Sequence, residues 1–298
     1  MASSAQGTSV AVACSVSDTN SNSDDNRSNR NGVVLLIRSA APTSKLHWKP
    51  ATKHSDWIEL NVSNNNDDDD KIKILETPMN HFVATSPSHS RTSWLPLGTT
   101  SVCAMTGLTS DIDHVCRVVQ KQVDTHRYIY DHTSFPAPIS HIVKTLAGTV
   151  QDAAQYAGGR PYGLQALVVG QEEDSVSASA ALPSRRRSLY VYTVDPSGSW
   201  RHWGSGCTAI GKNAEQVRSE LYKELVDNKS FALNPRSALQ VAMKSLLQAM
   251  RAAYINIDSD SYEAVLFWVD PVTNRCRVAS LDPREVQACR EELWKAIQ

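Results

Sequence analysis

Short runs of alternating apolar and polar residues, or of β-branched residues, predict the strands of this chain. Each run is bounded by Gly, Ser, Asn or Pro, which favour turns. Four runs precede any helical pattern, at residues 8–14, 33–37, 81–85 and 101–105. Strand patterns return at residues 164–170, 188–194, 199–203, 263–269 and 276–280. The turn sequence DPSG at 195–198 predicts a hairpin, because Pro fixes φ and Gly tolerates positive φ.

Apolar residues at helical spacing predict five helices. The first has an apolar stripe from Ile112 to Val123, runs to about Tyr128, and has Ser110 as its expected N-cap. The second covers about residues 139–153. The third follows Asn213 and Gln216, which are spaced as a capping pair. The fourth and fifth cover about residues 239–254 and 283–297.

The order of these elements is strands, two helices, strands, two helices, strands and a last helix. Runs of one class favour antiparallel sheets covered by helix layers over a doubly wound parallel sheet. Two facing sheets would bury their apolar faces against each other, and each helix pair would cover an outer face. We therefore expect an α+β protein with a four-layer αββα sandwich, two antiparallel sheets between helix layers.

Four polar, low-complexity segments interrupt this pattern, at about residues 15–31, 50–70, 86–100 and 174–188. Such sequences bury too little apolar surface to offset the entropy of ordering them. We expect them to be mobile insertions in a single domain covering residues 1–298. The triplet Arg185, Arg186 and Arg187 could bind an anionic partner, but a solvated loop is the simpler interpretation.

The composition narrows the possible partners. The 298 residues include 30 Lys and Arg against 31 Asp and Glu, a net charge of −1 that argues against a dedicated nucleic-acid or membrane-surface binder. The longest apolar runs, 33–37 and 264–269, fall far short of the roughly 18 residues of a membrane span. No secretory signal pattern opens the sequence, so we expect an intracellular protein. The six cysteines form no CxxC pair, so we expect no metal, disulfide framework or cofactor.

Several ordered strings resemble proteasome alpha-type subunits: MTGLTSD at 105–111, RPYG at 160–163, VDPSGS at 194–199 and AIGKN at 209–213. The resemblance covers residues 101–298 closely, and residues 7–14, 32–39 and 71–76 more loosely. It implies the same sandwich, shared with the N-terminal-nucleophile hydrolases. The residues that carry the structural motif are Thr106, Gly107, Asp111, Arg160, Pro161, Tyr162, Gly163, Asp195, Pro196, Gly198 and Gly211.

The resemblance implies a noncatalytic subunit of the 20S core particle, acting in ubiquitin-dependent protein degradation in the cytoplasm and nucleus. Its implied partners are other alpha and beta subunits and the tails of activators. Catalytic beta subunits instead use an N-terminal Thr, so Gly7-Thr8 is an alternative nucleophile. Arg38 stands where a catalytic beta subunit would carry its Asp, which argues against that alternative.

Two residues of the motif have specific expected roles. The resemblance implies that Lys71, at the start of a KIxxL string, lies in a pocket between neighbouring alpha subunits. There it would pair with the C-terminal carboxylate of an activator tail. A solvated Lys following the acidic run 67–70 is the other interpretation. For Arg160 we expect a structural role, with its guanidinium binding carbonyls at a helix-to-strand corner.

The sequence also departs from the family. Alpha subunits normally begin with a gate-forming tail and a helix across the ring, whereas here the first predicted strand follows almost at once. An orphan alpha-like scaffold that never joins a ring therefore remains a second alternative. The last segment, 277–297, resembles the ends of alpha type-6 or type-2 subunits and does not separate them.

Overall fold

The fold was analysed in a computed structural model of the chain. It describes residues 10–17, 30–39, 58–61, 71–77, 94–98, 100–130, 137–156, 159–173, 187–227, 234–253, 261–269 and 276–297.

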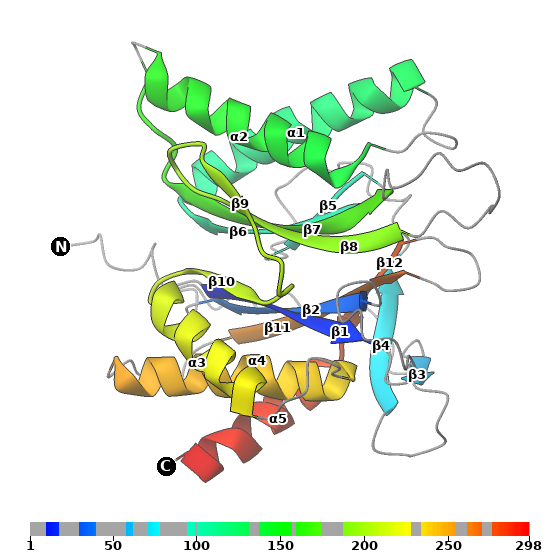
Figure 1. Cartoon of the computed structure of the whole chain (residues 1–298), viewed down its shortest axis with the longest axis vertical. Helices are drawn as coiled ribbons and strands as arrows, with labels where there is room; N and C mark the ends of the chain where they lie inside the picture. The colour runs from blue at the N-terminus through cyan, green and yellow to red at the C-terminus, as the bar shows by residue number, and fades with distance from the viewer. Residues whose placement is uncertain are drawn as a thin grey trace.

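Two antiparallel sheets form the centre of the molecule (Figure 1). The larger has seven strands in the order β10-β1-β2-β11-β12-β4-β3. Their bounds are β1 Val10–Ser17, β2 Arg30–Ser39, β3 Ile58–Asn61, β4 Lys71–Thr77, β10 Thr208–Gly211, β11 Ser261–Val269 and β12 Cys276–Leu281. The smaller has five strands in chain order: β5 Trp94–Leu97, β6 Ser101–Gly107, β7 Leu164–Glu173, β8 Arg187–Val194 and β9 Trp200–His202.

Helices cover the outer face of each sheet (Figure 1). Over the five-stranded sheet lie α1 (Thr109–Tyr130) and α2 (Ile139–Gln155). Against the seven-stranded sheet lie α3 (Ala214–Asp227), α4 (Pro235–Ala252) and α5 (Pro283–Ile297). The predicted four-layer sandwich is thus confirmed, and so are the five helices, with their ends moved by a few residues.

Three apolar clusters fill the spaces between these layers. Because side chains alternate along a strand, one strand supplies two of them. In β1, Ala11 and Ala13 face the other sheet, whereas Val12 and Cys14 pack toward α3 and α4. Central strands such as β1 and β2 are therefore apolar on both faces.

All four segments that we predicted to be insertions contain strand residues. Segment 15–31 overlaps the end of β1 and the start of β2, and segment 50–70 contains β3, which pairs with β4. Segment 86–100 contains β5, where Trp94 and Leu97 are buried. In segment 174–188, residues 187 and 188 already belong to β8. These segments were predicted from composition, which does not register a four-residue strand held by a neighbour.

Other local predictions are corrected or lie outside the described residues. Ser110 is the second residue of α1 rather than its N-cap, because the helical bonds begin at the Leu108 carbonyl. Asn213 has a φ of +58°, not the extended backbone of an N-cap residue. The strand β10 was not predicted. The predicted strand at 81–85 lies outside the described residues. Among those described, no helix combines the length and apolarity that crossing a membrane requires.

Candidate functional site

An ion pair joins the start of α1 to the corner between α2 and β7. The Arg160 guanidinium donates through Nη1 to Asp111 Oδ2 (2.8 Å) and through Nη2 to Asp111 Oδ1 (2.6 Å), a bidentate arrangement. We predicted that Arg160 binds carbonyls. Its main partner is instead a carboxylate, although Nη1 also lies 3.2 Å from the Pro161 carbonyl. Arg160 therefore acts in the structure as a clamp on the first turn of α1.

Arg160 keeps the buried carboxylate of Asp111 ionised. Asp111 is 4% exposed, whereas the Arg160 side chain is 61% exposed. Hydrogen bonding from Arg160 lowers the pKa of Asp111 to about 2, with further help from the Gly163 amide, while burial opposes the shift. Both Asp111 oxygens thus accept hydrogen bonds, and the carboxylate is held in its ionised form.

The backbone at this corner passes close to the end of β6. The Leu108 amide donates to the Gly163 carbonyl (2.9 Å), and the Gly163 amide donates to Asp111 Oδ2 (2.9 Å). A Cβ on Gly107, whose φ is +139°, would lie 2.1 Å from the Gly163 oxygen. The close approach explains why MTG ends in glycine. Thr106 is buried in β6, and the Tyr162 ring lies 5.7 Å from that of His114.

The DPSG sequence forms the predicted turn between β8 and β9. The Asp195 amide donates to the Ser199 carbonyl and the Gly198 amide donates to the Asp195 carbonyl, both at 2.9 Å. Gly198 has a φ of +81°, and a Cβ there would lie 2.5 Å from Cβ of Gln151 in α2. Pro196 stands in the turn between them. The turn therefore packs directly on α2.

Gln165 connects this turn to the other sheet. Its Nε2 donates to Asp195 Oδ1 (3.4 Å), and its Oε1 accepts from the Gly211 amide (3.0 Å) at the end of β10. One side chain thus joins two predicted motif residues that belong to different sheets. Sequence analysis missed Gln165, because a single Gln in a strand gives no signal until its neighbours in space are known.

Lys71 is the first residue of β4, and its backbone lies opposite Asn61 of the edge strand β3. The acidic run 67–70 that precedes it lies outside the described residues. The position at the end of a strand near the sheet edge is compatible with either role considered for Lys71. The pocket role stays a prediction.

The residues of the alternative catalytic site lie around the start of β1. Thr8 falls outside the described residues, two positions before β1 begins. Arg38 lies in β2 opposite Val10 and is 2% exposed. The cationic side chain of Arg38 is thus buried in the second strand; its correspondence to the Asp of a catalytic beta subunit stays a prediction. Within the described part of the chain, no group of three or more His, Cys, Asp or Glu could hold a metal ion.

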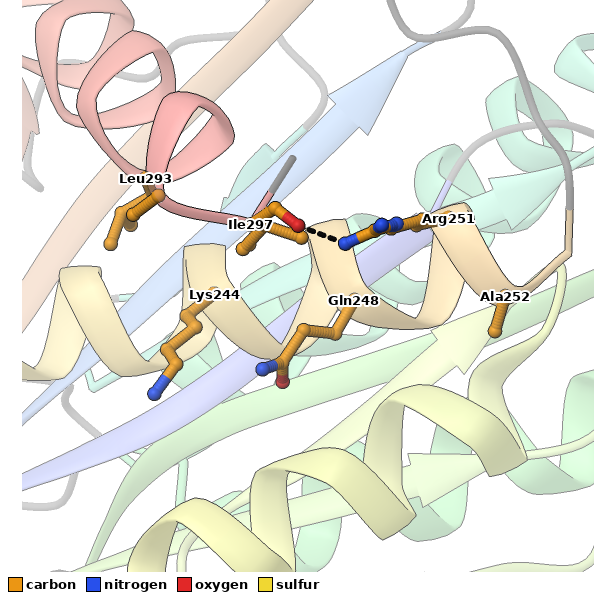
Figure 2. A pocket seen from close by; sticks show the side chains of 7 residues that line it. Lys244, Gln248, Arg251, Ala252, Leu293 and Ile297 are labelled. Atoms are coloured by element: carbon orange, nitrogen blue, oxygen red, sulfur yellow. Dashed lines mark hydrogen bonds between the residues drawn. The ribbon is translucent and has the colours of Figure 1, made fainter.

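A groove of about 930 Å³ lies between α4 and α5 (Figure 2). It is lined by Lys244, Gln248, Arg251, Ala252, Leu293, Ala296 and Ile297. Its two cationic groups already have partners: Lys244 lies 2.8 Å from Glu224 of α3, and Arg251 donates to the Ile297 carbonyl. These contacts tie three helices together. The sequence could not indicate this groove, because its two walls are separated by about forty residues.

Comparison with known proteins agrees with this geometry. The family model described as "Proteasome subunit" matches residues 90–263. Proteasome subunit alpha type-8 of Mus musculus is 28% identical over 158 residues, which are 53% of this chain and 56% of that protein. Proteasome subunit alpha type-4 of Dictyostelium discoideum is 28% identical over 166 residues, 56% of this chain and 58% of that protein. The alpha type-4 subunit of spinach (Spinacia oleracea) is 26% identical over 148 residues, which are 50% of this chain and 51% of that protein. The chain spans about half the length of the curated relatives it matches.

Two antiparallel sheets enclosed by helix layers, with a clamped α1 and a turn seated on α2, define a protein of the αββα sandwich class. The chain belongs to the proteasome subunit family. The predicted likeness to alpha-type subunits is confirmed by these relatives, which are of types 8 and 4. The likeness of residues 277–297 to types 6 or 2 stays a prediction.

Proposed function

We propose that this chain is a noncatalytic, structural subunit of the outer alpha ring of a 20S proteasome core, assembled with other alpha and beta subunits. In that role it serves ubiquitin-dependent protein degradation in the cytoplasm and nucleus. The alpha-type relatives support the assignment to this ring. The buried Arg38 supports the noncatalytic role, because a cation beside the start of β1 cannot orient a Lys or an amine as a carboxylate does.

The observation that carries the proposal is exposed apolar surface at the end of α1. Tyr128, Ile129 and Tyr130 are 91%, 61% and 55% exposed. These three consecutive residues present large apolar groups to solvent at the end of the helix. Exposed clusters of this kind mark interaction sites. Tyr156, 72% exposed just after α2, adds to the same helix layer.

The test is assembly of a tagged chain carrying Tyr128→Ser and Ile129→Ser. We expect the wild-type chain to co-purify with beta subunits in native mass spectrometry, and the double variant to be recovered mainly free. Tyr222→Ser on α3 is the matched control, since Tyr222 is 67% exposed on the opposite helix layer. A wild-type chain that stays monomeric while its neighbours assemble would contradict the proposal and favour the orphan scaffold.

Docking of activator tails is the finer part of the proposal, with Lys71 as the residue that pairs with the tail carboxylate. A Lys ammonium on a long stem suits a carboxylate in a groove. We expect Lys71→Ala to weaken binding of a tail peptide to assembled particles and to leave the melting temperature nearly unchanged. Lys73→Ala, on the same strand, is the control. If Lys71→Ala and wild-type particles bind the tail peptide equally, the proposed pocket role of Lys71 is wrong.

A further inference from the structure

Two cysteine thiols face each other across neighbouring strands of the seven-stranded sheet. The register of β1 and β10 pairs Ala13 with Thr208, so the next residues outward, Cys14 and Cys207, are opposed. Their Sγ atoms lie 3.9 Å apart, and Cys207 donates its thiol proton toward Cys14. The two side chains therefore already point at each other, from strands that lie side by side in Figure 1.

The spacing of the two strands suits a covalent bond. Directly opposed Cα atoms of antiparallel strands lie about 4.5 to 5.5 Å apart, inside the range of about 4.4 to 6.8 Å found for disulfides. A bond of about 2.05 Å needs the sulfur atoms to approach by roughly 2 Å, which rotation of the two side chains can supply.

Access to the pair differs between the two thiols. Cys14 is 0% exposed and Cys207 is 7% exposed, and both belong to the core between the seven-stranded sheet and α3–α5. Cys207 directly follows the turn at Gly204 and Ser205, which are exposed. The Ser15 amide donates to Cys207 Sγ (3.4 Å) and so holds that sulfur in place. A small oxidant therefore reaches Cys207 first, when this turn opens.

We propose that Cys14 and Cys207 are a site of oxidative cross-linking, forming a disulfide when the chain meets a small peroxide. Cys207 sulfur attacks one peroxide oxygen, the O–O bond breaks, and Cys207 sulfenic acid and water result. Cys14 sulfur then attacks the Cys207 sulfur, the S–O bond breaks, and the leaving hydroxide takes the Cys14 proton as water. Two thiols are oxidised, one peroxide is reduced, and two waters form.

The disulfide would hold the edge strand β10 against β1. β10 is the terminal strand beside β1, has four residues, and leads directly into α3. Short edge elements open locally at low cost. The disulfide would join positions 193 residues apart, and closing so long a loop restricts the unfolded chain strongly. The hydrogen bond from Cys207, together with burial, raises the pKa of Cys14. Cys14 is therefore a slow nucleophile while the site is closed, because the thiolate is the reactive form.

The experiment treats the folded full-length chain with hydrogen peroxide, then unfolds it in an alkylating reagent and maps the peptides. We expect a mass lower by two hydrogen atoms, four alkylated cysteines out of the six in the sequence, and one cross-linked peptide pair containing Cys14 and Cys207. The oxidised chain should melt about 5 to 10 °C higher than the reduced chain.

Two cysteine variants distinguish oxidation of this pair from oxidation of the other cysteines. Cys207→Ser should abolish both the cross-linked peptide and the gain in melting temperature. Cys289→Ser, a half-buried thiol in α5, should retain both. Because the mapping uses the wild-type chain, a variant that fails to fold does not remove the test. Six alkylated cysteines after peroxide, or a disulfide between other positions, would overturn the proposal.

Discussion

At the scale of single residues, the Asp111–Arg160 pair makes stability depend on acid. The folded state lowers the pKa of Asp111 from 3.8 to about 2. A lowered pKa stabilises the fold above the ordinary value, and that contribution is lost as pH falls from about 4 toward 2. We therefore expect Asp111→Asn to be less stable than wild type at pH 7, with the difference shrinking steadily between about pH 4 and pH 2.

Chemical unfolding across this pH range measures the effect. Asp124→Asn is the matched control for the loss of one negative charge from α1, since Asp124 is exposed on the same helix. A difference between wild type and Asp111→Asn that stays constant down to pH 2 would mean that the ion pair does not set the acid sensitivity.

Gly107 gives a second prediction at this scale, because its missing side chain is a requirement of packing. A Cβ would lie 2.1 Å from the Gly163 oxygen, at a φ that side chains avoid. We expect Gly107→Ala to cost about 3 kcal/mol from strain and overpacking. Gly148→Ala, inside α2 with nothing within 4 Å of the new Cβ, should gain about 0.5 to 1 kcal/mol. Denaturant titration of both variants measures the two changes in the free energy of unfolding. Similar changes in the two variants would contradict the close approach of Gly107 to the Gly163 oxygen.

The sequence allowed part of this corner to be predicted. Arg160 and Asp111 both stood among the motif residues, but their pairing did not follow, because 49 residues separate them. The sequence suggested nearby carbonyls as partners of Arg160, because these are the partners that local sequence can offer. Gln165 had no signal at all, since its two contacts lie 30 and 46 residues away.

At the scale of elements, the strand β5 lies within a polar segment that we predicted to be an insertion. Leu97 is fully buried and packs with α1 and α2. We expect Leu97→Ala to destabilise the chain by about 2 to 5 kcal/mol, the usual effect of removing a buried leucine side chain. Leu95→Ala, on the same strand and only partly buried, should cost less. Thermal unfolding would show the difference. Wild-type stability in Leu97→Ala would mean that 86–100 is a dispensable loop after all.

Three of the strands that were not predicted share a physical reason, whereas β4, also not predicted, has seven residues. β3, β5 and β10 have four residues each, too few for a period of two to stand out. β5 also contains Pro96, which favours an edge position. Long helices such as α2 and α4 were predicted well because many apolar positions repeat along them. Pairing with a neighbour, not local preference, makes the short strands.

At the scale of the whole molecule, the noncatalytic role predicts that Thr8 is dispensable for peptidase activity. We expect Thr8→Ala to leave hydrolysis of fluorogenic peptides by purified particles unchanged, because we predict that the buried Arg38 takes the place of the catalytic carboxylate. Intact mass of the incorporated chain is the companion measurement. The noncatalytic role would be contradicted if the mature chain began at Thr8. It would also be contradicted if the variant lost one cleavage type specifically, because both outcomes indicate that Thr8 is a nucleophile.

The layer order was predictable because the sequence segregates strands and helices into runs, and few arrangements bury all their apolar faces. The strand order was not, because it depends on contacts across the full length. β1 lies between β10 and β2, and β2 lies next to β11. No local pattern distinguishes these neighbours from others.

This strand order has a consequence for the chain as it is synthesised. Every strand of the five-stranded sheet lies within residues 94–202, so that sheet can assemble as one continuous stretch leaves the ribosome. β1 and β2 precede that sheet in the chain, yet their outer neighbours β10 and β11 are made only with residues 208–211 and 261–269. Until then this apolar hairpin has two open backbone edges, which invite pairing with other chains. The nascent chain therefore has its greatest need of a chaperone at its earliest strands.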